Sequence, residues 1–157
     1  MRNELQRQLV EQYPDIFEMV GSDPRDSAMA WGIECGDGWF DILDHLCREL
    51  TRTVETIDRL HPEYKFRVKA VQVKEKYGTL RFYVDFHYDE NINDEQMKRL
   101  TSYMDRISGA ISFAESMTAR TCEDCGARAT MNPDEPFPIV LCRACETTRY
   151  DARWQTL

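Results

Sequence analysis

Residues 79–86 have the sequence TLRFYVDF, which places an apolar side chain at every second position. A period of two residues is typical of a β-strand that buries one face and exposes the other. Leu80, Phe82 and Val84 are therefore expected to face a core, while Arg81 and Tyr83 stay free on the opposite face. The stretch predicts a sheet as one layer of the fold.

A second strand precedes this one, and together they predict a β-hairpin over residues 64–88. Tyr77-Gly78 supplies the turn, because glycine accepts the positive φ that tight hairpin turns require. In the first strand, the parity of the apolar residues changes between Ala70 and Val71. This change of phase predicts a β-bulge at that position.

Helical spacing of apolar residues recurs on both sides of the hairpin. It predicts helices over residues 2–13, 39–60 and 94–117. Asp37 is placed to cap the second helix. Asn93 with Gln96 has the pattern of a capping box at the start of the third. Because a hairpin alone is marginal in water, we expect the second and third helices to pack on it.

The predicted fold class is α+β, with helices packed on a β-hairpin or small antiparallel sheet and a zinc ribbon after them. We expect an α+β body over residues 1–120 and a zinc-ribbon module over residues 121–157. Residues 31–40 hold three glycines and two tryptophans, which predicts a tight turn whose aromatic rings fold back on the core. We expect the core of the body to form without the metal.

Four cysteines form two Cys-x-x-Cys pairs separated by sixteen residues. This spacing is typical of four-cysteine zinc sites, because each pair can turn onto one metal and the connecting loop closes the tetrahedron. One structural Zn²⁺ ion is predicted, and its four protein ligands leave no position for water. An iron site and redox or disulfide pairs are the alternatives. The predicted ligands are Cys122, Cys125, Cys142 and Cys145.

The remaining details of the module follow from its composition. Residues 133–138 read PDEPFP, which predicts a polar loop at the tip of the ribbon. Residues 139–141 are apolar and are predicted as a strand that leads into the second cysteine pair. Cys35 and Cys47 lie outside the pairs, and we expect a loop thiol and a small core residue on a helix.

Composition places the chain among folded proteins, since 42% of its residues are hydrophobic. The opening sequence MRNELQRQLV lacks the apolar stretch of a signal peptide, and no run of about 18 apolar residues predicts a membrane span. We therefore expect a cytoplasmic protein that binds no membrane. The formal net charge of -8 disfavours general binding of nucleic acid, which depends on many cations.

The charge is uneven, because residues 64–84 carry six cations and one carboxylate and so have a net charge of +5. Cations interleaved with aromatic side chains can bind single-stranded nucleic acid through charge and stacking. The alternatives are a contact with a protein partner and an exposed sheet face whose cations pair with acidic helices. The candidate contact residues are Lys74, Lys76, Arg81 and Tyr83.

Acidic residues gather near the predicted start of the second helix, where Asp37, Asp41 and Asp44 can share one helical face. Such carboxylates, with Glu34 and His45 nearby, could hold a divalent ion in a metal-dependent nuclease or hydrolase. The alternative is a solvated helix start whose acids interact favourably with the helix dipole. His61 and His87 are expected in loops or on the surface, and we assign no catalytic residue.

Three segments together resemble a family of small phage and prophage proteins with a C-terminal zinc ribbon. They are GIECGDGWFDILDHLCREL (residues 32–50), QVKEKYGTLRFYV (72–84) and CEDCG with LCRAC (122–126 and 141–145). The resemblance covers residues 32–145 and carries over only the four zinc ligands. It implies the cytoplasm of an infected or lysogenic bacterium, where small acidic phage proteins often bind a host protein.

Three functions are therefore compared. The first is a non-catalytic, zinc-stabilised accessory protein that binds a host or phage macromolecule and inhibits a defence or gene-expression factor. The second is a nucleic-acid-binding module that uses the basic hairpin over residues 64–84. The third is a metal-dependent hydrolase built on the aspartates. The closed metal site and the acidic composition favour the first.

Overall fold

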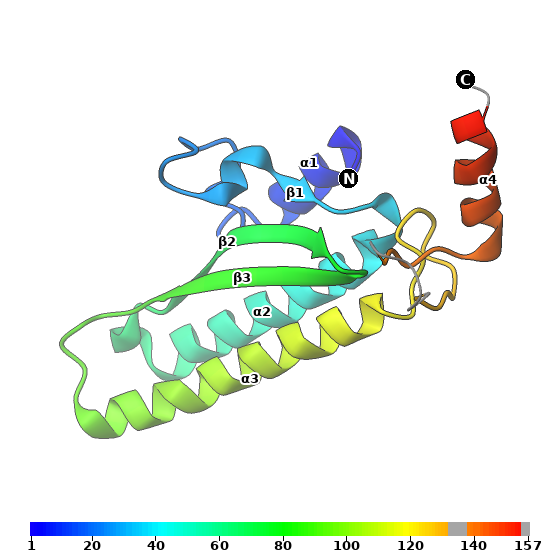
Figure 1. The fold of residues 1–157 in the computed structure, drawn as a ribbon. Helices are drawn as coiled ribbons and strands as arrows, with labels where there is room; N and C mark the ends of the chain where they lie inside the picture. Colours follow the sequence, from blue (N-terminus) through cyan, green and yellow to red (C-terminus); the bar gives the residue numbers. More distant parts are fainter. Residues whose placement is uncertain (132–137, 155–157) are drawn as a thin grey trace.

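The computed structural model describes residues 1–131 and 138–154, and its fold class is α+β, as predicted. A three-stranded sheet and two long helices form the body, and the last helix stands apart at one end (Figure 1). The elements are α1 (Asn3–Gln12), η1 (Ala28–Trp31), β1 (Ile33–Glu34), η2 (Asp37–Trp39), α2 (Phe40–Leu60), η3 (Pro62–Tyr64), β2 (Arg67–Lys76), β3 (Thr79–His87), α3 (Asp94–Thr118) and α4 (Arg143–Trp154).

The hairpin of β2 and β3 forms as its alternation predicts. Its register shifts between Ala70 and Gln72, which leaves Val71 as the extra residue of a bulge and confirms the predicted change of phase. Tyr77 and Gly78 both have positive φ, 55° and 74°, in the turn. Two such residues are typical of a type I′ turn, whose twist matches that of the strands.

The strand β1 was not predicted, and it makes the sheet mixed. It runs parallel to β2, with Ile33 opposite Val73. Two residues are too few to show a period in the sequence, so only the turn character of this segment could be recognised. One tryptophan of the segment folds onto the core as expected, since Trp39 is fully buried, but Trp31 is 70% exposed.

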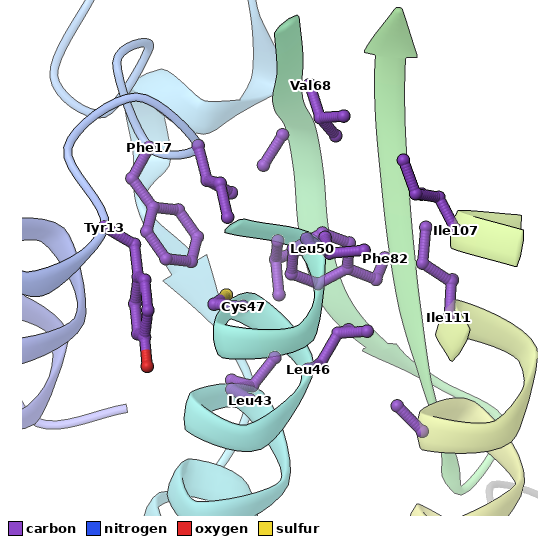
Figure 2. Close-up of a cluster of buried hydrophobic side chains, with 14 of the residues drawn as sticks. Tyr13, Phe17, Leu43, Leu46, Cys47, Leu50, Val68, Phe82, Ile107 and Ile111 are labelled. Atoms are coloured by element: carbon purple, nitrogen blue, oxygen red, sulfur yellow. The ribbon is translucent and has the colours of Figure 1, made fainter. Parts of the chain in front are cut away.

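The helices α2 and α3 lie side by side along one face of the hairpin, and the N-terminal segment lies beyond β2 (Figure 1). Between these layers is the core, where Leu50 and Phe82 lie together and Tyr13 and Phe17 close the side next to α2 (Figure 2). Cys47 is fully buried on α2, which confirms the expected core role. The capping box predicted at Asn93 and Gln96 is also formed.

The end of α3 covers part of the outer edge of β3. The backbone N–H of Leu80 donates to Thr118 Oγ1 at 2.9 Å, and that of Phe82 donates to Glu115 Oε1 at 3.0 Å. Side chains of a helix therefore satisfy edge groups that would otherwise be open to a further strand. These bonds fix the end of α3 beside the hairpin turn, where the cysteine-rich segment begins.

Two leucines of α2 offer a matched test of this packing. Leu50→Ala should lower the free energy of unfolding by about 2–5 kcal/mol, because Leu50 is fully buried between the helices and the sheet. Leu60→Ala should change it by less than about 1 kcal/mol, since Leu60 is 54% exposed at the helix end. Urea unfolding followed by circular dichroism measures both, and equal losses would contradict this placement of α2.

Candidate metal centre

The four cysteines of the two pairs come together at one end of the body. The sulfur atoms of Cys122, Cys125, Cys142 and Cys145 all lie within 4.8 Å of one another. Cys125 Sγ and Cys142 Sγ are 3.6 Å apart, close to the edge of about 3.8 Å in a tetrahedron with metal–sulfur bonds of about 2.3 Å. A disulfide needs about 2.05 Å. Four thiols in this arrangement could hold one metal ion.

The backbone around the first pair has the shape that a metal-binding turn requires. The N–H of Gly126 donates to the carbonyl of Cys122 at 2.9 Å, and the N–H of Cys122 donates to the carbonyl of Ala127 at 2.7 Å. Gly126 has a φ of 76°, which glycine adopts at no steric cost. The chain therefore reverses tightly after Cys125, and both thiols face the same point.

The thiols strongly influence one another's ionisation. A backbone hydrogen bond from Cys145 is the largest of the effects that lower the pKa of the Cys142 thiol, to about 7. Hydrogen bonding with Cys125 and Cys142 raises the pKa of the Cys145 thiol. Protons bound to some of these thiols must leave when a metal enters, because the metal ligand is the thiolate. Metal affinity should consequently fall as the pH is lowered.

Glu123, inside the first pair, joins the cysteine-rich segment to the body. Its carbonyl accepts a hydrogen bond of 2.8 Å from the N–H of Gly38, and its Oε1 accepts one of 2.9 Å from the N–H of Gly36. Its own N–H donates to the carbonyl of Val140 at 2.8 Å. Burial raises the pKa of the Glu123 carboxyl, although the bond from Gly36 opposes this. One residue thus links the body, the first pair and the chain before the second pair.

Trp39 completes this contact from the body. Its side chain is fully buried, and its Nε1–H donates to the carbonyl of Thr121 at 2.9 Å. A Cβ atom on Gly38 would lie 2.2 Å from the carbonyl oxygen of Cys122, and one on Gly36 would lie 2.2 Å from that of Glu123. Only glycine permits this approach of two backbones. We define the residues Gly36–Trp39 and Thr121–Gly126 as the docking contact.

The docking contact was missed in the sequence, where these glycines indicated only a tight turn. Their spacing, Gly-Asp-Gly-Trp before a helix, was the available signal, but nothing in the sequence identified the segment that approaches them. The prediction that Asp37 caps the second helix is wrong. Its carboxylate instead accepts hydrogen bonds from the N–H and the Nε–H of Arg2, and no side chain caps α2 at Trp39.

The second pair differs from the prediction. Residues 139–141 form no strand, and the second pair spans the start of α4, with Cys142 just before it and Cys145 inside it. Arg149 of α4 donates to the carboxylate of Asp124 through Nε and Nη2. The strand was inferred from three apolar residues, a run too short to distinguish a strand from an extended loop. Most of the loop predicted over residues 133–138 lies outside the described residues.

The aspartates proposed for a hydrolase are held by different partners. Asp37 binds Arg2, while Asp44 accepts from Tyr13 Oη at 2.7 Å and from Arg48 at 2.6 Å. Asp41 lies exposed in the first turn of α2. In the part of the chain that the structure describes, the four cysteines are the group of three or more His, Cys, Asp or Glu side chains that could hold a metal.

The cations of the hairpin fall into two sets. One set forms ion pairs, Lys65 with Asp89, Arg67 with Asp58 and Lys69 with Glu18. Lys74, Lys76 and Arg81 make no ion pair with the described residues, although Lys76 lies 5.5 Å from the centre of the Tyr77 ring. Tyr83 is 45% exposed, as its parity predicts. The unpaired set lies towards the hairpin turn.

The two single histidines are placed near the ends of secondary-structure elements. His61 follows the last residue of α2 and stacks on the ring of Tyr64, with 4.8 Å between the ring centres. His87 is exposed at the end of β3. Both positions agree with the expected loop or surface roles.

No protein-family model, curated protein or solved structure matches this chain. The resemblance to phage proteins therefore stays a prediction from the three segments quoted above. Among the helices that the structure describes, none combines the length and hydropathy that crossing a bilayer requires.

Replacing one ligand tests the cluster. Cys122→Ser should reduce the bound metal from one ion per chain to a small fraction of that value, because three thiolates cannot complete the tetrahedron. The fluorescence of Trp39 should shift towards that of exposed indole, since its hydrogen bond to Thr121 depends on this segment. Elemental analysis by mass spectrometry and emission spectra measure the two effects. Cys35→Ala is the control and should keep its metal, because Cys35 lies outside the cluster.

A pair of glycines tests the docking contact. Gly38→Ala should lower the melting temperature and weaken metal binding, because the new methyl group would overlap the backbone of Cys122. Gly109→Ala is the control in the middle of α3, where an added Cβ meets no atom within 4 Å. That change should raise the stability by about 0.5–1 kcal/mol. Tolerance of Gly38→Ala with full metal content would disprove the close approach.

Proposed function

We propose that this protein is a non-catalytic binding protein whose four cysteines hold one structural zinc ion. The observation that carries this proposal is the cluster itself, in which four protein thiols lie within 4.8 Å of one another. Zinc is favoured because tetrahedral sites with four thiolates select zinc or iron, and zinc is the usual metal where no redox chemistry is needed. Four protein ligands complete its coordination and leave no position for a substrate.

The role of the metal follows from what the cluster is attached to. The docking contact joins the start of α2 to the segment that follows α3, so an ion at the four thiols would stabilise the ends of both helices. A small satellite core of Cys122, Ala129 and Val140 supports the metal site and is separate from the main core. Such a small unit depends on its metal for folding.

The setting of the proposal comes from the resemblance of residues 32–145 to phage and prophage proteins. We extend the proposal to a protein of the bacterial cytoplasm that binds a host or phage macromolecule and inhibits a defence or gene-expression factor. The acidic surface suits a partner with a basic binding face, because opposite charges speed association and favour correct pairing.

Two measurements test the proposal. Elemental analysis of the purified protein should find one zinc ion per chain, and stoichiometric iron would refute the choice of metal. A pull-down with the tagged protein from bacterial lysate, with and without nuclease, should retain one stoichiometric protein after nuclease treatment. Turnover in a magnesium or manganese screen for hydrolysis that Asp41→Ala abolishes would refute the non-catalytic role.

Nucleic-acid binding is the second candidate function. It is favoured by the three hairpin cations that form no ion pair with the described residues. Lys74, Lys76 and Arg81 have no carboxylate partner among the described residues, and exposed Tyr83 lies opposite Gln72 in the same part of the hairpin. A sulfur atom of Met131 lies against Gly78, so the cysteine-rich module adjoins this end of the hairpin. Cations and aromatic rings at one site could bind single-stranded nucleic acid.

A charge-matched pair of variants tests this candidate. Changing Lys74, Lys76 and Arg81 together to Ala should abolish any gel shift of single-stranded DNA or RNA at low salt, because these cations would contact phosphates. Changing Lys65, Arg67 and Lys69 to Ala removes the same charge but affects only cations already paired with carboxylates. Equal loss in both triple variants would show that net charge alone drives binding.

A further inference from the structure

An apolar groove lies between α2 and α3, on the half of these helices nearest the cysteine cluster. Its volume is about 390 Å³, within the usual range for binding clefts. Ile42 and Leu46 of α2 line one side, and Phe113 and Met117 of α3 line the other. Phe113 is 67% exposed and Met117 is 41% exposed. Two large apolar side chains on one helix surface, bordering a hollow, are typical of a binding site.

Small residues keep this groove open. Ala110 and Ala114 are part of its lining, one turn apart on α3, where the α2 lining has the larger side chains of Ile42 and Leu46. An alanine fills too little space to close the gap between two helices. Phe113 lies beside them and does not fill the hollow, as its exposure shows. The groove can therefore accept side chains from another molecule.

The charged side chains that line the groove indicate which kind of partner could bind there. Asp41, His45 and Glu49 line its α2 side at intervals of four residues, which places them in one row along the helix. The described residues that line the groove include two carboxylates and no lysine or arginine. Arg106 reaches Glu49 from α3 at 2.5 Å, but Asp41 has no ion pair among the described residues. The rim of the apolar floor thus carries one unpaired carboxylate, Asp41, and no lysine or arginine among its described lining residues.

A second copy of this chain fits the rim poorly. It would bring the same carboxylates and a further net charge of -8 to the contact. Like charges close together oppose association unless they are neutralised. A partner with cations beside its apolar side chains fits both features of the groove.

We propose that the groove between α2 and α3 binds a cationic amphipathic helix of a partner protein. The proposal rests on the proposed function of the chain as a binding protein, and it names the surface and the class of partner. Apolar side chains at helical spacing would occupy the floor between Phe113 and Leu46, and a lysine or arginine of the partner would pair with Asp41. The docking contact holds the α2 and α3 ends that form this groove, so metal removal should weaken the site.

The test uses the full-length, zinc-loaded protein and a defined probe. The probe is a fluorescein-labelled synthetic peptide of about 14 residues, four helical turns of leucine, alanine and lysine with the leucines on one face. A matched peptide carries glutamate in place of lysine. Fluorescence anisotropy should show saturable binding of one lysine peptide per chain. The glutamate peptide should bind at least tenfold more weakly.

Variants then locate the site. Phe113→Ser should weaken binding at least tenfold, while Trp31→Ser removes another exposed aromatic ring, at the end of η1, and should leave affinity unchanged. Asp41→Asn should weaken binding several-fold, and Glu4→Gln is its control, because both acids lie in the first turn of a helix. No saturable binding, or equal binding by Phe113→Ser, would overturn the proposal.

Sedimentation tests whether a second copy of the chain occupies the groove. The peptide and lysate experiments together distinguish failure of the groove proposal from failure of the proposed binding function. A dimer of the free protein that Phe113→Ser dissociates would assign the groove to a second copy and overturn the proposal. If the wild-type protein does not bind the lysine peptide and the lysate partner still binds Phe113→Ser, the groove is excluded and the proposed binding function stands. If neither peptide nor lysate partner binds, both are rejected.

Discussion

The hydrogen bond from the N–H of Gly38 to the carbonyl of Glu123 lies where the α+β body meets the cysteine-rich segment. Around it, two backbones approach so closely that side chains on Gly36 or Gly38 would overlap the cysteine segment. The bond joins η2, which directly precedes α2, to the segment after α3, and Trp39 is buried against the same segment. This contact joins the cysteine cluster to the end of the body at which α2 begins and α3 ends.

The parts predicted correctly are those in which a regular repeat or a fixed ligand spacing appears within one segment. The alternation over residues 79–86 indicated β3, and helical spacing indicated α1, α2 and α3. The change of parity at Ala70 located the bulge, and the spacing of the cysteine pairs identified the cluster. In each case the structure depends on residues that are close in sequence. These residues form one face of a strand, one face of a helix or a turn that carries two thiols.

The parts that could not be predicted arise from contacts between distant segments. β1 has two residues and is a strand only because β2 lies beside it. Gly36 and Gly38 carry no side chains, so their neighbour could not be inferred from them. Phe113 does not belong to the row of buried residues on α3. Its spacing in the sequence shows this, but only the position of α2 shows that Phe113 borders a groove. The split of the hairpin cations into paired and unpaired sets likewise depends on where acids from other elements lie.

The separation in sequence across the docking contact has a consequence for the order of folding. Gly36 and Glu123 are 87 residues apart, and Trp39 and Thr121 are 82 residues apart. Closing so long a loop is entropically expensive in an extended chain, but it becomes easy once α2, the hairpin and α3 have packed and brought the two segments together. The layered core is therefore the template on which the cysteine segment assembles. A metal ion bound by the four thiols would then lock a scaffold that had already formed.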